Sequence, residues 1–159
     1  MKLPIVVFAS AALAFSTPAL AEHDYLFVAL TGDNASGIFL DLETIQKTPT
    51  RKDVWTLIVN LAPEAQLPDH VSYAMRRYTY DCDARTTDMT YAALFTSRGE
   101  SIRQGPTATG PRPIVPSTIS ETMANLLCKG EVPTFEHVAT IEEARTMARK
   151  IAGLNREPK

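Results

Sequence analysis

The chain has 159 residues, of which 45% are hydrophobic and 21% charged, with a formal net charge of −2 and two cysteines. This mild charge excludes the strongly basic composition that is typical of nucleic-acid-binding domains. The length, once a leader is removed, suits one domain with its own hydrophobic core.

The first 21 residues have the pattern of a secretory signal peptide. Lys2 precedes an apolar run over residues 5–15, and the segment ends in Ala19-Leu20-Ala21, an Ala-x-Ala cleavage site. The apolar run is shorter than the roughly 20 residues that a membrane-spanning helix needs. We therefore expect cleavage after Ala21 and a periplasmic or secreted domain over 22–159. No lipid anchor is expected, because no cysteine follows the cleavage site closely. No stable membrane insertion is expected, because no second hydrophobic stretch is long enough.

Strand-like segments fill the first part of the mature chain. They combine apolar, β-branched and aromatic residues with flanking turn residues, and they cover 24–30, 36–42, 53–61, 71–83, 89–97 and 101–104. Residues 43–52 contain Pro49 and indicate a connector with at most one helical turn, and 62–70 contains two prolines and indicates an exposed loop. Trp55, the single tryptophan, alternates in register with Leu57 and is expected in the core.

Two helices are expected near the C-terminus, after a proline-rich loop over 105–116. Each begins with a capping box, at Thr118-Ile119-Ser120-Glu121 and at Thr140-Ile141-Glu142-Glu143, and each ends at a glycine. Strands followed by helices predict an α+β domain. We expect a single antiparallel sheet of about five to six strands, with the C-terminal helices packed on one face.

The two cysteines predict a disulfide. Cys82 ends the strand over 71–83, and Cys128 falls in the last turn of the first helix. Two cysteines in an exported chain favour one structural bridge, which would tie that helix to the sheet. Neither cysteine lies in a Cys-x-x-Cys unit or near a histidine, so a redox motif or a zinc site has little support. A pair of free thiols is the alternative.

Four groups of residues together resemble a known family: Phe39-Leu40-Asp41 with Thr44-Ile45, Val54-Trp55-Thr56-Leu57, Tyr80-Asp81-Cys82, and Val115-Pro116-Ser117-Thr118 ahead of the helix that ends in Cys128. With this spacing, residues 24–130 are similar to the surface-adhesin protein E family of bacterial envelope proteins. The helix at about 140–153 lies outside the resemblance.

The resemblance implies an antiparallel sheet with a disulfide-tethered helix, exposure to the envelope or exterior, and binding to host extracellular-matrix and plasma proteins. The chain departs from the adhesin after which the family is named because it lacks a lipid-accepting cysteine. That difference leaves surface anchoring open.

Catalytic and metal-binding residues do not form a recognisable motif. His23, His70 and His137 are far apart in the sequence, so a metal site would require the fold to gather them. Asp69, His70 and Ser72 are residue types of a hydrolase, but they are crowded on a loop without a nucleophile elbow. We therefore expect no catalytic residue, no metal and no cofactor.

Tyr78, Tyr80, Arg76 and Arg77 form the candidate binding face. Aromatic side chains on a sheet can form a ligand platform, although they more often pack beneath a helix. A wider positive surface for an acidic protein or polysaccharide would use the scattered arginines, which are Arg76, Arg77, Arg98, Arg103 and Arg112.

Two functions follow from these residues. The first is a non-catalytic envelope binding module whose partners are extracellular-matrix or envelope proteins. The alternative is a periplasmic small-ligand-binding or enzymatic domain that uses the tyrosine-bearing face. A concave pocket beside Tyr78 and Tyr80 would distinguish the alternative from the first.

Overall fold

The computed structural model describes residues 23–63, 68–107, 109–131 and 136–154, so the expected signal peptide lies outside the described residues. The elements in chain order are β1 (Tyr25–Leu30), β2 (Ser36–Lys47), β3 (Arg51–Asn60), the short 3-10 helix η2 (Pro68–His70), β4 (Tyr73–Asp81), β5 (Thr86–Phe95), β6 (Ser101–Pro106), β7 (Arg112–Pro113), α1 (Ile119–Ala124), its π-helical continuation η3 (Asn125–Lys129), β8 (His137–Val138) and α2 (Ile141–Ile151).

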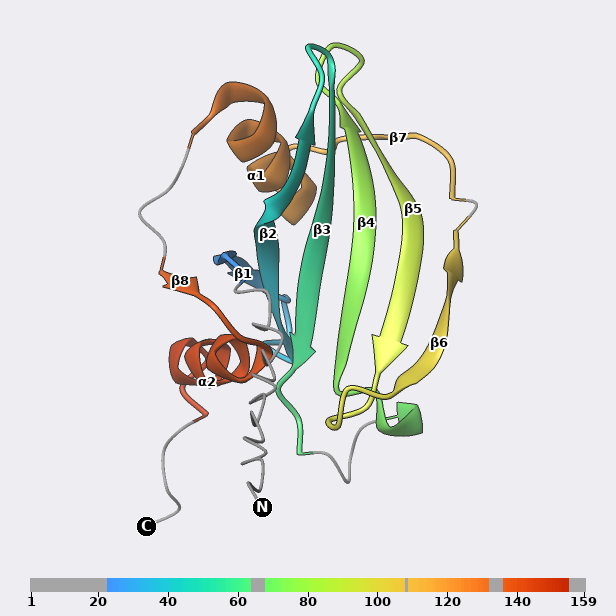
Figure 1. The fold of residues 1–159 in the computed structure, drawn as a ribbon. Coiled ribbons are helices and arrows are strands. Elements are labelled where there is room, and N and C mark those ends of the chain that lie inside the picture. Colours follow the sequence, from blue (N-terminus) through green and yellow to red (C-terminus); the bar gives the residue numbers. More distant parts are fainter. Residues whose placement is uncertain (1–22, 64–67, 108, 132–135, 155–159) are drawn as a thin grey trace, which may run out of the picture.

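These strands form one antiparallel sheet in the order β6-β5-β4-β3-β2-β1-β8, and β7 pairs with the far end of β5 (Figure 1). The long hairpins β2–β3 and β4–β5 make up its centre. The expected fold class is confirmed, with eight strands among the described residues instead of the expected five to six. The two extra strands, β7 and β8, have two residues each, too short for any periodicity to predict.

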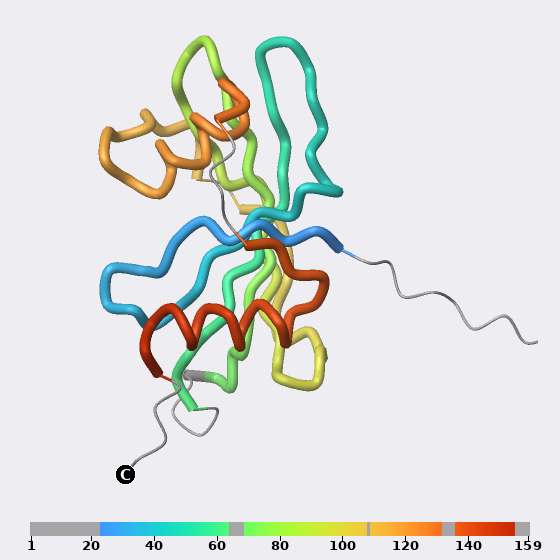
Figure 2. Tube along the Cα trace, turned by 90° about the vertical axis from the view of Figure 1, so that its left-hand side faces the viewer, coloured from blue at the N-terminus to red at the C-terminus, as the bar shows by residue number. Residues whose placement is uncertain are grey.

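The two helices pack on opposite faces of the sheet, not on one face as expected. On β2, Leu40 belongs to the core beneath α1 and η3, whereas its neighbour Phe39 belongs to the core beneath α2. Successive strand residues point to opposite faces. Figure 2, which looks along the sheet from its β1 side, shows α1 beside the upper strands and α2 crossing below β1. We call these surfaces the α1 face and the α2 face.

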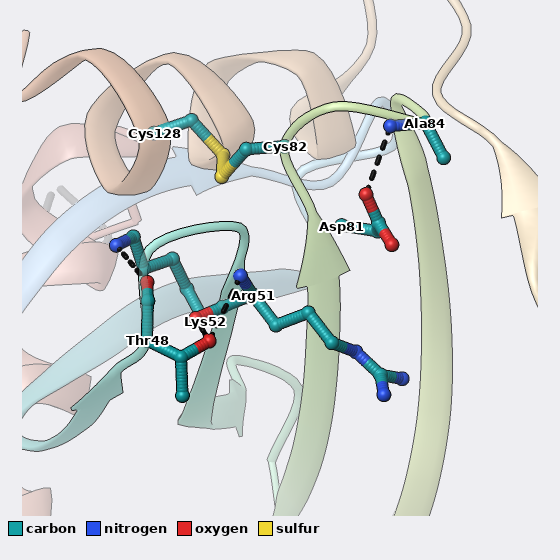
Figure 3. The surroundings of a disulfide bond; sticks show 7 residues. All are labelled: Thr48, Arg51, Lys52, Asp81, Cys82, Ala84 and Cys128. Carbon is teal, nitrogen blue, oxygen red and sulfur yellow. Dashed lines mark hydrogen bonds between the residues drawn. A yellow bond between two sulfur atoms is a disulfide. The ribbon is translucent and has the colours of Figure 1, made fainter.

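A disulfide fastens the α1 end of the molecule, as predicted. Cys82, directly after β4, is bonded to Cys128 in η3 with a Cα–Cα distance of 5.7 Å (Figure 3). The backbone N–H of Cys82 donates to the carbonyl of Thr50 at the tip of the β2–β3 hairpin. The disulfide therefore joins η3 to the end of the sheet where the tips of the β2–β3 and β4–β5 hairpins meet.

The predicted connector over 43–52 is wrong, because β2 continues to Lys47 and β3 begins at Arg51. The ladder contains a register shift between Asp41 and Gln46. There the Thr44 hydroxyl donates to the carbonyl of Asp41 and accepts a hydrogen bond from the N–H of Trp55. The Thr44 side chain replaces a ladder contact, so β2 continues through the register shift. The sequence pattern predicted the end of the strand at this point.

Candidate functional site

Among the described residues, α2 covers one end of the α2 face and no helix covers the rest. Helix α2 packs over the end of the sheet that includes Phe39, Leu57 and Val59. Farther along the same strands lies a groove of about 450 Å³ that we call the Trp55 groove. Its lining residues come from β2 to β6 and the segment before β1: His23, Asp41, Thr44, Trp55, Met75, Tyr91, Ala93, Phe95 and Gln104.

An aromatic pair forms the centre of the groove. Trp55 and Tyr91 meet edge to face, with ring centroids 5.7 Å apart. Both are half-buried, although Trp55 was expected in the core. The register explains the pairing, because Trp55 and Tyr91 both lie opposite Arg77, one on each side of β4. Half-exposed aromatic rings on a rigid sheet provide a large contact area at low entropic cost.

A polar hollow of about 390 Å³ follows the groove along the same face, toward the β2–β3 turn. At its floor Asp53 accepts hydrogen bonds from the Arg77 guanidinium at 2.8 Å and from the Thr79 hydroxyl at 2.6 Å. The apolar groove and this polar hollow are contiguous because Arg77 and Trp55 are cross-strand partners. The surface thus offers aromatic contact beside hydrogen-bonding groups.

A buried carboxylate closes the other side of the groove. Asp41 is fully buried, and one of its oxygens contacts Nδ1 of His23 at 2.9 Å. The imidazole of His23 stacks on Tyr25. Burial raises the pKa of Asp41, an effect that the interaction with His23 partly opposes. Burial and the charge of Asp41 raise the pKa of Tyr25 to about 12, so its hydroxyl stays neutral.

The predicted binding face is divided between the two faces of the sheet. Tyr80 is 1% exposed and its hydroxyl contacts the sulfur of Met123 in α1 at 3.1 Å. Tyr78 packs against the same core. Arg77 points to the opposite face, where it pairs with Asp53, while Arg76 shares the face of the tyrosines. The tyrosines therefore pack against the α1 core, and the β4–β5 ladder has a register shift between Arg77 and Tyr78.

The histidines are not gathered into one site. His23 and His137 border a shallow hollow with Asp24, and His137 contacts that carboxylate at 2.6 Å, whereas His70 lies in η2. Within the described residues, His, Cys, Asp and Glu form no group of three or more that could hold a metal ion. Ser72 is buried and accepts a hydrogen bond from Arg145 of α2, so it holds the helix in place.

Sequence reasoning missed the Trp55 groove. The alternation of Trp55 with Leu57 correctly predicted the face of the sheet on which Trp55 lies. How far α2 extends over that face depends on tertiary packing. A usable signal was the polar pair Arg76-Arg77 within β4, since β4 is half-buried from Met75 to Thr79.

The fold and site define a class of protein: an α+β domain with a disulfide-tethered helix and an aromatic groove on one face of its antiparallel sheet. None of the helices in the described ranges is long and apolar enough to cross a membrane. The family profile "Surface-adhesin protein E" matches residues 27–129. The chain belongs to this family, and α2 lies beyond the matched region.

Solved structures of Haemophilus influenzae protein E are similar to this chain. Crystal form II shares 11% identity with a TM-score of 0.47, covering 76% of this chain and 98% of that one. A structure of protein E from non-typeable Haemophilus influenzae shares 11% identity with a TM-score of 0.45, covering 89% and 97%. No curated protein matches the chain significantly.

Proposed function

We propose that the chain is an exported, non-catalytic binding module that engages a macromolecular partner through the Trp55 groove. The observation that carries the proposal is the half-buried Trp55–Tyr91 pair on a sheet face that α2 leaves open. Membership of a family named for a surface adhesin supports a binding role at the envelope. Extracellular-matrix, plasma and envelope proteins are the partner classes to test.

The single tryptophan gives a direct test, because Trp55 fluorescence reports on the groove itself. The purified mature protein is titrated with a panel of extracellular-matrix, plasma and envelope proteins, with binding measured in parallel by biolayer interferometry. We expect a saturable fluorescence change at micromolar concentration with one partner. Tyr91→Ala should weaken that binding about thirtyfold, the effect of a central aromatic contact. Val115→Ala, which truncates an exposed apolar side chain elsewhere, is the matched control.

Absence of saturable binding to any member of the panel, or equal binding by Tyr91→Ala, would contradict the proposal.

The groove volume of about 450 Å³ also suits a small ligand, which favours a small-ligand-binding domain as the second candidate. Saturable quenching of Trp55 by a small molecule, without macromolecular binding, would support that candidate. A small-ligand site on the tyrosine-bearing face loses its support, because Tyr80 is buried beneath α1.

We also propose that export ends with cleavage after Ala21, leaving the product periplasmic or secreted without a lipid anchor. The signal-peptide pattern supports this. Intact-mass analysis of the protein from the periplasm and the medium should show a chain beginning at Glu22. A chain that retains residues 1–21 would contradict it.

A further inference from the structure

A second hollow, of about 400 Å³, lies on the α1 face over β4, β5 and β6, away from the Trp55 groove. Arg76 of β4 and Arg103 of β6 stand on its two sides. Between them, Ala92 of β5 pairs with Gly105 of β6, and a side chain at position 105 would meet open space. The hollow exists because the small residues Ala92 and Gly105 lie between the long side chains of Arg76 and Arg103.

Both arginines carry uncompensated positive charge. Four other arginines of the described residues have side chains with polar partners; for example, Arg77 pairs with Asp53 and Arg85 with Glu121. In contrast, no acidic side chain of the described residues forms an ion pair with Arg76 or Arg103. A guanidinium presents a planar fork of N–H donors that matches a carboxylate. The hollow therefore favours an anionic occupant.

The hollow adjoins a free strand edge. β6 is the outermost strand on its side of the sheet, and Figure 1 shows no ribbon alongside its outer edge. The N–H of Thr107 points inward, to the carbonyl of Thr90. By the alternation of an antiparallel ladder, the N–H of Gln104 points outward. An edge of this kind can pair with an added peptide strand.

We propose that an extended acidic segment of a partner protein pairs with the outer edge of β6 and places a carboxylate between Arg76 and Arg103. A glutamate on the added strand, next to Gly105, faces the hollow without a side chain in its way. The floor includes Met89 and Leu94, whose apolar surface suits a peptide better than a sulfated polysaccharide.

The test uses a fluorescein-labelled, end-capped peptide of alternating valine and glutamate, with binding to the mature protein followed by anisotropy. A peptide with glutamine in place of glutamate should bind at least tenfold more weakly. Arg103→Gln should weaken binding about tenfold, which corresponds to one charge-assisted contact. Arg98→Gln, which removes an exposed arginine from the β5–β6 turn, should leave binding unchanged and serves as the charge-matched control.

A glutamate peptide that is N-methylated at alternate residues tests the strand pairing without changing the protein. We expect it to lose binding when the methyl groups occupy the edge that faces β6. Equal binding of the glutamate and glutamine peptides, or unchanged binding by Arg103→Gln, would overturn the proposal. Arginine-dependent binding of heparin without peptide binding would also overturn it, in favour of a polysaccharide. These outcomes are independent of the Trp55 groove, because Arg103 and Trp55 lie on opposite faces.

Discussion

Asp41 is a buried carboxylate with an incomplete set of partners. One oxygen contacts His23, and the other lacks a hydrogen-bond partner among the described residues. Burial raises the pKa of this carboxyl, so folding favours its neutral form. Its contribution to stability is therefore present below the pKa of an unfolded aspartate, about 4, and is lost as the pH rises through the folded pKa.

Asp41→Asn should remove this pH dependence. The amide stays neutral, so the free energy of unfolding of the variant should increase relative to that of the wild type as the pH rises from 4 to 8. Urea denaturation at several pH values measures the difference. Asp83→Asn removes an exposed negative charge in the β4–β5 turn and controls for net charge. A constant difference between Asp41→Asn and wild type across this range would show that burial of the carboxylate carries no penalty.

At the scale of elements, α2 sits against the sheet through a contact that only glycine allows. A β-carbon added to Gly37 of β2 would lie 2.5 Å from Cβ of Ala148, closer than two carbons can approach. Gly37→Ala should therefore push α2 away and lower the free energy of unfolding by about 1–3 kcal/mol. Gly32→Ala, at a glycine with nothing within 4 Å, is the matched control. Denaturant titrations that give the same midpoint for the two variants would contradict the close contact.

The disulfide should contribute a large part of the stability. Cys82 and Cys128 are 46 residues apart, and closing a loop of that length is worth about 4 kcal/mol in the chain-entropy model. The double variant Cys82→Ala/Cys128→Ala should lose about this much, measured by urea denaturation. Wild-type protein unfolded in the presence of reductant provides the control and should match it. A loss below about 1 kcal/mol would mean that the helix is held without the bridge.

The sequence predicts helix caps correctly where the capping contacts join residues that are close in the chain. The predicted capping box at Thr140 is complete, since its hydroxyl accepts from the N–H of Glu143 and the Glu143 carboxylate accepts from the N–H of Thr140. At Thr118 the first contact forms, but Glu121 instead accepts from the N–H of Ser117. The predicted second strand, over 36–42, ended too early. The Thr44 contact at the register shift in β2 involves Trp55, which is eleven residues away in the sequence.

For the whole molecule, the sequence predicts an antiparallel sheet, two helices and the disulfide partners. It does not predict which face each helix covers. Strand alternation puts Phe39 and Leu40 on different faces, but both are apolar and both are buried, so the pattern allows either helix on either side. For the same reason the sequence did not show which aromatic residues a helix would cover. Tyr80 proved to be core, and Trp55, expected to be core, lies half-buried in the groove.

The position of α2 beyond the family match raises the question of whether the fold needs it. The matched region ends at residue 129, yet α2 buries Ala144, Met147 and Ala148 against the sheet. The Arg149 guanidinium also donates to the carbonyl of Leu61, which ties the helix to the end of β3. Removing α2 would expose one of the two core clusters, to which no other helix of the described residues contributes a side chain.

Truncation after Ala139 should therefore abolish cooperative unfolding. Losing the contacts of Met147 alone is comparable to a large-to-small core substitution, about 2–5 kcal/mol, and a domain has only about 5–15 kcal/mol in total. Calorimetry and near-ultraviolet circular dichroism of the truncated protein test this. Truncation after Leu154, which leaves α2 intact, should keep the wild-type transition and is the length control. A cooperative transition in the shorter form would mean that the α1 core and the disulfide alone define the folded unit, with α2 as an addition to the family fold.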